Sequence, residues 1–241
     1  GYSSIYINGG QVDNKGIEAS LSLNQALGPV EWNSTLTYTI NRNKIKKLLK
    51  PTTLKDGLLV EQDMLDLDGV GNVKTRLFEG GSVGDLYVTA LRTDEHGYID
   101  VDYVNNTVSV DGNAGERGDG WIYAGNSQAK YTMGWRNSFS WKGLTLGFLI
   151  NARVGGVCVS MTQALMDSYG TSKATADARD AGGVMINGYL VPAAQKYYQT
   201  VGTGAGSMYV YSATNIRLAE LSLGYDVPVT KLVPWIKSMN V

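Results

Sequence analysis

Two stretches of alternating side chains, joined by only two residues, constrain the fold of this chain more than any other feature. Between Tyr131 and Trp141, large apolar residues occupy one parity and small or polar residues the other, with only Asn137 out of phase. After Lys142-Gly143 the alternation resumes from Leu144 to Val154. A period of two predicts strands with one apolar face, and the short glycine-containing junction predicts a tight hairpin turn.

The length of these two strands allows them to cross a bilayer. Each runs about 11 residues, which is what a tilted strand needs to span the hydrocarbon core. Trp141 at the turn and Tyr131 at the far end occupy the places of the aromatic girdles of membrane barrels. A strand pair in a large soluble sandwich would show the same alternation, so this hairpin alone leaves both interpretations open.

The same pattern occurs near the N-terminus and again near the C-terminus. Apolar residues alternate with polar ones from Ile17 to Leu23 and, after a turn at 27–29, from Trp32 to Ile40. We expect a short strand at residues 2–8 before them, followed by a turn at Gly9-Gly10 and Asp13-Asn14. A further strand is predicted near 215–227, ending before Pro228.

The connections between these strands are either very short or very long. Residues 41–81 lose the alternation and carry a basic cluster followed by an acidic one, so we predict a long polar loop there. Strand character returns at 85–91, and residues 105–120 are predicted to form another loop. The second long connection, 155–214, contains two predicted short helices at 160–169 and 172–181. Alternation of short turns with long loops is typical of transmembrane barrels and favours a barrel over a sandwich.

Composition excludes several classes of function. The formal net charge of -1 and the lack of a basic run argue against nucleic acid as a partner. The only cysteine, Cys158, excludes an internal disulfide and is expected to pack as a small apolar residue. No run of 18 apolar residues is present, so no spanning helix is predicted. The first residues lack the features of a signal peptide and the last stop without a closing signal, so both ends look cut.

Five segments carry a resemblance to a known family. NGGQVDNKGIEASL at Asn8–Leu21 is similar to a signature of TonB-dependent outer-membrane receptors. Three further segments, SVGDLY at 82–87, residues 125–156 and YVYSATNIRLAELSLGYDVP at 209–228, resemble the SusC/RagA branch of those receptors. The segment 166–183 is close to the helical loop of that branch. Together these segments cover most of the chain.

The resemblance implies an all-β fold of antiparallel strands that form part of a transmembrane β-barrel. The chain has room for about 7–8 of the 22 strands of such a barrel, with long extracellular loops at about 41–81 and 155–214, one of them containing short helices. Residues 1–241 would then be the C-terminal portion of the barrel, and the plug domain of the family is absent. Such a partial barrel exposes strand edges and an apolar face, so alone it is expected to need detergent, oligomers or a rearranged packing.

The resemblance also implies a function and partners. The complete protein would lie in the outer membrane of a Gram-negative cell, in contact with membrane lipid, and import a glycan or an oligopeptide. It would work with a SusD-like lipoprotein cap and draw energy from TonB through the N-terminal part. We expect no enzymatic activity and no cofactor. The alternative is a soluble all-β carbohydrate-binding module, whose apolar stripes would lie in a core between two sheets.

Two groups of residues are candidate contacts for cargo or partners. Arg136 and Arg153 fall on the polar parity of adjacent strands and would face the barrel lumen, where they could meet cargo or pair with acidic groups of the wall. Six tyrosines in and after the second long connection could contact the cargo or the cap, or pack the loop; they are Tyr169, Tyr189, Tyr197, Tyr198, Tyr209 and Tyr211. No catalytic residue or metal ligand is predicted: His96 is the only histidine, and the acidic run at 63–68 lacks the full calcium-loop pattern.

Overall fold

The computed structural model describes residues 10–48, 52–53, 59–60, 63–229, 235–236 and 239–241. The strand predicted at residues 2–8 lies outside these residues. The chain divides into two compact units, which are treated one at a time below. The strand unit comprises residues 14–42, 129–155 and 213–241, and the loop unit comprises residues 1–13, 43–128 and 156–212.

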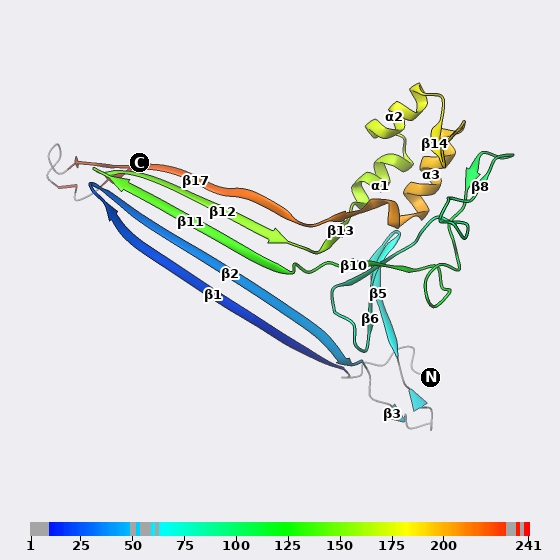
Figure 1. Ribbon diagram of the computed structural model, residues 1–241, viewed down its shortest axis with the longest axis horizontal. Coiled ribbons are helices and arrows are strands. Elements are labelled where there is room, and N and C mark those ends of the chain that lie inside the picture. The colour runs from blue at the N-terminus through cyan, green and yellow to red at the C-terminus, as the bar shows by residue number, and fades with distance from the viewer. Residues whose placement is uncertain (1–9, 49–51, 54–58, 61–62, 230–234, 237–238) are drawn as a thin grey trace. The chain divides into compact units, whose positions relative to one another are not determined.

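Long antiparallel strands dominate the strand unit (Figure 1). They form one sheet in the order β1-β2-β11-β12-β17-β18. Its members are β1 (Gln11–Leu27), β2 (Val30–Lys47), β11 (Tyr131–Trp141), β12 (Leu144–Val154), β17 (Asn215–Val227) and β18 (Met239–Asn240). The predicted bounds of β11 and β12 are confirmed, and both residues of their turn have positive φ, 48° at Lys142 and 85° at Gly143. The described part of the sheet thus holds six strands, where about seven or eight were expected.

Two predictions at the start of the sheet were wrong. Asp13-Asn14, expected in a turn, lies inside β1, and residues 41–47, expected in a loop, continue β2. Backbone pairing holds these segments whatever their side-chain pattern, because each ladder hydrogen bond needs only the N–H and C=O groups. Ile45 shows this clearly: its N–H donates to Gly81 O at 2.9 Å, and its C=O accepts from Gly80 N–H at 2.8 Å.

A β-bulge in β17 keeps its apolar side chains on one face. Ile150 of β12 faces Leu218, whereas Leu149 faces Glu220, so Ala219 has no opposite residue. One extra residue reverses the parity of everything that follows it. Ile216 and Leu218 before the bulge therefore share a face with Leu221, Leu223 and Tyr225 after it.

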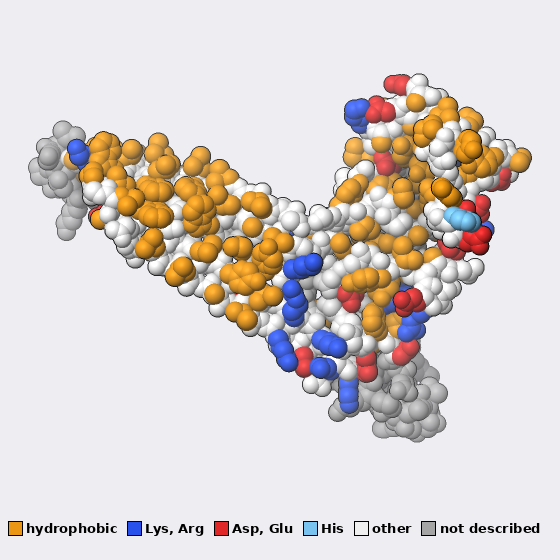
Figure 2. Space-filling view, viewed as in Figure 1, with side chains coloured by type: hydrophobic (Ala, Val, Ile, Leu, Met, Phe, Trp, Pro, Cys, Tyr) orange, Lys and Arg blue, Asp and Glu red, His pale blue; other side chains and the backbone are white. Residues whose placement is uncertain are grey.

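The apolar face of the sheet is open rather than covered by a second sheet. Figure 2 shows apolar side chains spread along the long strands, and Leu221 in the middle of β17 is 68% exposed. In a sandwich the same stripes would lie in a core between two sheets. Among the described residues the arrangement matches a barrel wall and not the soluble module.

Asn137 is a polar residue on the apolar face of the sheet, where it lies opposite Ser34 and both are covered by tryptophan side chains. The Trp32 indole N–H donates to Asn137 Oδ1 at 3.0 Å, and the Trp135 indole N–H donates to Ser34 Oγ at 3.0 Å. The rings of Trp32 and Phe139 stack with centroids 6.0 Å apart. Asn137 is only 1% exposed as a result.

The loop unit contains a four-stranded sheet and four short strand pairs. The sheet has the order β10-β7-β6-β5, with β5 (Met64–Val70), β6 (Val73–Phe78), β7 (Asp85–Val88) and β10 (Ile122–Asn126). Strands β5 and β6 lie inside the predicted 41–81 loop, which is a second correction of that segment; β7 confirms part of the strand predicted at 85–91. The short pairs are β3 (Thr52–Thr53) with β4 (Leu59–Val60), β8 (Val101–Asp102) with β9 (Thr107–Val108), β13 (Val157–Val159) with β16 (Val210–Ser212), and β14 (Val184–Ile186) with β15 (Tyr189–Val191).

Helices fill much of the second long connection. The two predicted helices are confirmed as α1 (Met161–Ser168) and α2 (Lys173–Asp180), and the side chains of Ser160 and Ser172 cap their N-termini. Helix α3 (Ala194–Gly204) and the 3₁₀ turn η1 (Gly206–Tyr209) were not predicted. No side chain caps α3 at its N-terminus, and its last turn contains two glycines, so the usual helix signals are weak.

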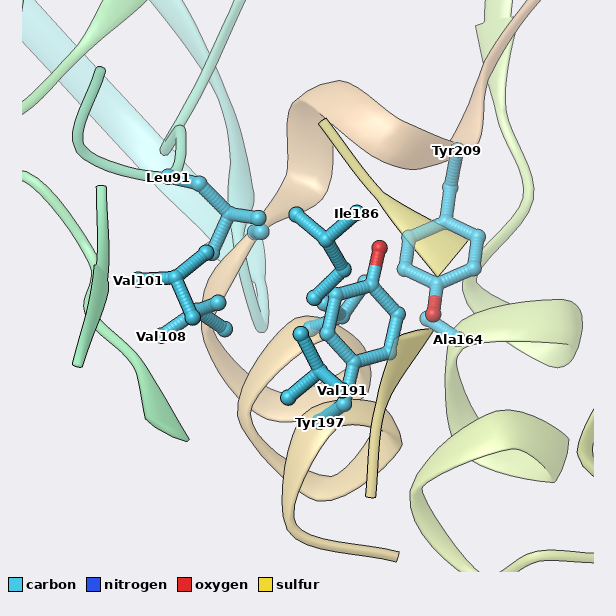
Figure 3. Close-up of a cluster of buried hydrophobic side chains, with 10 residues drawn as sticks. Leu91, Val101, Val108, Ala164, Ile186, Val191, Tyr197 and Tyr209 are labelled. Atoms are coloured by element: carbon cyan, nitrogen blue, oxygen red, sulfur yellow. The ribbon is translucent and has the colours of Figure 1, made fainter. Parts of the chain in front are cut away.

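A hydrophobic core ties these segments of the loop unit together (Figure 3). Its buried residues come from the segment after β7, the β8–β9 pair, α1, α3 with η1, and the β14–β15 hairpin. They are Leu91, Val101, Val108, Ala164, Ile186, Val191, Tyr197, Val201, Ala205 and Tyr209. Residues separated by more than 100 positions in the chain thus share one core. The long connection is a packed structure and not an open loop.

The close crossing of α1 and α3 requires a glycine at position 202. A Cβ atom there would lie 2.4 Å from Ala164 O and 2.8 Å from Ser168 Cβ. We expect Gly202→Ala to destabilise the loop unit by about 1–3 kcal/mol through overpacking. The measurement is the urea concentration at which thermolysin cleaves the loop unit in the complete protein. Gly112→Ala is the matched control because nothing lies within 4 Å of its added Cβ; equal midpoints for the two variants would contradict the prediction.

Candidate functional site

A polar groove lies on the face of the strand unit opposite the apolar stripes. It has a volume of about 520 Å³. Hydroxyl, amide and guanidinium groups line most of it, from Thr37, Thr39, Thr132, Met133, Gly134, Asn151, Ala152, Arg153, Asn215 and Arg217. Such groups can donate hydrogen bonds to the hydroxyl, carboxylate or carbonyl oxygens of a ligand.

Of the two arginines singled out in the sequence, only Arg153 lines this groove. Arg217 lines it as well and was missed. The bulge hid the position of Arg217. Counted along the sequence, Arg217 alternates in step with the apolar Leu221, but in the structure it lies on the same face as Glu220. The apolar residues Ile216 and Leu218 on either side of Arg217 would have placed Arg217 on the polar face.

Arg136 forms an ion pair within the wall. Its Nη2 atom lies 2.9 Å from Glu220 Oε2, and Nη1 lies 3.4 Å from Oε1, so the contact is bidentate. Pairing with a wall carboxylate was the alternative to cargo contact for this residue. The structure supports that alternative for Arg136.

The Arg136–Glu220 pair is expected to contribute little to stability. Both side chains are about half exposed, and exposed pairs couple by about 0.2–1 kcal/mol. A double-mutant cycle of Arg136→Gln and Glu220→Gln, read from urea unfolding of the complete protein in detergent, measures this coupling. A coupling above roughly 2 kcal/mol would show instead that the pair is desolvated.

The six candidate tyrosines fall into two groups. Tyr197 and Tyr209 are buried in the core of the loop unit, and Tyr209 is only 2% exposed. The prediction that these two tyrosines contact cargo or the cap was wrong. Their rings fill the core and pack the loop, which was the alternative. Tyr169, Tyr189 and Tyr211 are exposed, and Tyr198 is partly buried against the core. Burial raises the pKa of Tyr197, Tyr198 and Tyr209, so these phenols stay neutral at physiological pH.

Tyr169 and Tyr198 line a cavity of about 270 Å³ among the helices. The cavity also contains Asp167, which the sequence did not single out, together with Arg179 and Gln199. Asp167 is 4% exposed; its Oδ2 accepts from the Tyr209 hydroxyl at 2.9 Å, and its Oδ1 has no hydrogen-bond partner among the described residues. This carboxylate can accept a further hydrogen bond.

Tyr189 belongs to a second, more open site. A pocket of about 510 Å³ is lined by the exposed rings of Tyr98, Tyr103 and Tyr189, with Asp94 and Asp100 beside them. Tyr103 and Tyr189 meet edge to face with centroids 6.5 Å apart. Tyr98 and Tyr103 are tyrosines that the sequence did not single out.

Cys158 is exposed, contrary to the prediction that it packs as an apolar residue. The reason is the alternation of β13, in which Val159 packs against the core and Cys158 points to the other side. His96 is exposed beside Glu95.

Two of the acidic residues considered for calcium, Asp63 and Asp66, make ion pairs. Asp66 pairs with Lys74 and Arg76, and Asp63 pairs with Arg117. In the part of the chain that the structure describes, no three His, Cys, Asp or Glu side chains come together as a metal site. Within those same residues, no helix is long and apolar enough to cross a membrane.

Comparisons with known proteins agree with this architecture. No family model matches the chain. It is 27% identical over 95% of its length to TonB-dependent receptor P3 of Formosa agariphila, and 26% identical over 96% of its length to TonB-dependent receptor P26 of the same organism. These alignments cover 23% and 24% of the two relatives, so the chain spans about a quarter of their length.

A solved structure shares the fold. The RagAB peptide importer, in its open-open state, matches with a TM-score of 0.58 at 17% identity, over 96% of this chain and 24% of that one. Strands of barrel length with one apolar and one polar face, together with this match, give the chain the fold of part of a β-barrel wall. The resemblance to TonB-dependent receptors is confirmed: the chain is similar to about a quarter of the length of such receptors.

Proposed function

We propose that this chain supplies the C-terminal wall and outer loops of a SusC/RagA-type transporter that imports glycans. The observation that carries the proposal is the sheet of long strands with an open apolar face on one side and the polar groove on the other. In a barrel the first face meets lipid and the second lines the path of the cargo. The loop unit would then lie outside the cell.

A glycan is favoured over an oligopeptide by the chemistry of the candidate sites. The groove offers threonine hydroxyls and asparagine amides beside Arg153 and Arg217, and the exposed tyrosines offer flat rings with a polar tip. Sugars present hydroxyl edges and apolar C–H faces that such groups can bind. A SusD-like lipoprotein would cap the loops, and TonB would provide energy through another part of the complete protein.

The test is uptake by the native host with and without the gene for the complete protein. Fluorescently labelled neutral oligosaccharides and labelled tetrapeptides serve as two separate cargo classes. We expect deletion to abolish oligosaccharide uptake, re-expression to restore it, and loss of TonB to have the same effect as deletion. Loss of tetrapeptide uptake alone would move the assignment to peptides, and unchanged uptake of both classes would contradict the transporter proposal.

The proposed partner can be tested separately by affinity purification of the tagged complete protein from detergent-solubilised outer membranes. A lipoprotein in a fixed ratio to the receptor is the expected result. Purification of the receptor alone, under conditions that keep the barrel folded, would argue against a stable cap.

A further inference from the structure

A third cavity, in the four-stranded sheet of the loop unit, has a lining that none of the functions above uses. Its volume is about 520 Å³. Four aromatic side chains line it: Phe78 from β6, Tyr87 from β7, Trp121 just before β10, and Tyr123 from β10. The charged residues of the lining are Arg76, Glu116 and Arg117.

The aromatic rings are held in place by one another and by cations. Tyr87 meets Tyr123 edge on at 5.5 Å and Phe78 at 6.4 Å between centroids. Lys74 Nζ lies 4.0 Å from the centroid of Trp121, so it covers one face of the indole and leaves only the other for a ligand. A platform fixed before binding costs less ordering entropy when the ligand arrives.

The wall that carries Trp121 is fixed as well. Asp119 accepts from Arg76 Nη2 at 2.6 Å, and its other oxygen accepts from the Trp121 backbone N–H at 3.4 Å. Gly115, with φ of 87°, passes so close to Trp121 O that an added Cβ would lie 2.0 Å from it. The two ends of the loop 115–121 therefore lie against each other, and Asp119 ties the loop to Arg76 of β6.

The arginines of the cavity already have carboxylate partners. Arg76 is 3% exposed and pairs with Asp66 at 2.8 Å and with Asp119 at 2.6 Å, and Arg117 pairs with Asp63 at 3.1 Å. An acidic ligand would have to compete with these carboxylates. Glu116 adds a further negative charge to the lining. The balance of charge favours a neutral ligand.

We propose that this cavity binds a neutral pyranose unit of the glycan cargo, with its apolar face on Trp121 and its hydroxyls directed to the charged edges. The inference rests on the proposed function and adds a specific binding site to it. A pyranose has both an apolar face for the aromatic rings and hydroxyl groups for the charged edges of the cavity. An aromatic peptide side chain would cover the rings equally well, but it would desolvate Glu116 and Arg117 without offering them hydrogen bonds.

The test uses saturation-transfer NMR on the complete receptor in detergent. The probes are methyl β-D-glucopyranoside, methyl β-D-galactopyranoside, glucuronate and N-acetyl-phenylalaninamide. We expect a signal from at least one neutral pyranoside that weakens about fivefold in affinity in Trp121→Ala and is largely kept in Trp121→Phe. Trp235→Ala, which removes an exposed tryptophan of the strand unit outside this cavity, is the matched control and should bind like the wild type.

Several outcomes would overturn the inference. They are no signal from either neutral pyranoside, an equal signal in Trp121→Ala, or binding of glucuronate or N-acetyl-phenylalaninamide alone. Protease protection of the loop unit shows whether Trp121→Ala is misfolded. If it is, the affinity of Trp121→Phe is compared with that of the wild type at a second probe concentration, and this comparison decides whether Trp121 contacts the pyranoside. Normal glycan uptake together with any of these outcomes would reject the cavity while leaving the transporter proposal intact.

Discussion

Replacing Leu221 with arginine should sharply reduce the amount of folded receptor in the outer membrane. Leu221 is the seventh of the thirteen residues of β17 and lies on the open apolar face, 68% exposed. At the middle of a membrane strand, a lipid-facing arginine costs about 2–4 kcal/mol. This is a large part of the net stability of an ordinary domain. The measurements are receptor abundance in outer-membrane fractions and the heat-dependent gel mobility that reports a folded barrel.

The neighbouring residue provides a strict control. Ser222 has the opposite parity, faces Gly147 across the strand pair and shares the polar face with Glu220. An arginine there can reach water and a carboxylate, so Ser222→Arg should accumulate nearly as well as the wild type. Similar losses for both variants would show that the two faces of β17 are not lipid and lumen.

Replacing Arg76 with methionine should produce the largest loss of stability in the loop unit. The substitution keeps the stem of the side chain but leaves Asp66 and Asp119 without their shared cation. Removing one partner of a fully buried pair costs about 3–5 kcal/mol; because both carboxylates here remain about one-third exposed, we expect roughly 2–3 kcal/mol. Thermolysin cleavage of the loop unit at increasing urea gives the change. Arg117→Met removes an exposed pair and should cost less than about 1 kcal/mol.

The same network predicts how the stability of the loop unit depends on pH. Hydrogen bonds from Arg76 lower the pKa of both Asp66 and Asp119 in the folded state. A carboxyl with a lowered folded pKa stabilises the protein above its unfolded pKa, near 3.9, and loses that contribution as the pH falls through the folded value. Wild-type protection should therefore fall below about pH 4, and this part of the fall should be absent in Arg76→Met. Parallel acid profiles for the two proteins would contradict the assignment.

Much of the strand unit could be predicted from the sequence, because its two environments alternate with the backbone. Each residue of the sheet faces either an apolar or a polar environment. From Tyr131 to Val154 the side chains alternate accordingly, with Asn137 as the exception. The helices α1 and α2 were predictable for a similar reason, since each begins with a serine cap that acts locally.

Other features could not be predicted because distant partners create them. In β5 and β6 charged residues alternate with uncharged ones over only a few positions, but the partners of these strands come from elsewhere in the chain: β7 pairs with β6, and Arg76 joins Asp66 to Asp119. The polar groove depends on the bulge at Ala219, which places Arg217 beside Asn151. In both cases the order of residues along the chain does not name the distant partner.

The sequence by itself determined the resemblance to one class of protein, most of the long strands of the sheet and the apolar face of β11 and β12, because these follow from residue type and a period of two. The tertiary structure alone decided which tyrosines are buried, which arginines are paired and where aromatic rings gather into a cavity. Those outcomes depend on contacts between residues that lie far apart in the chain, and such contacts form only when the segments pack.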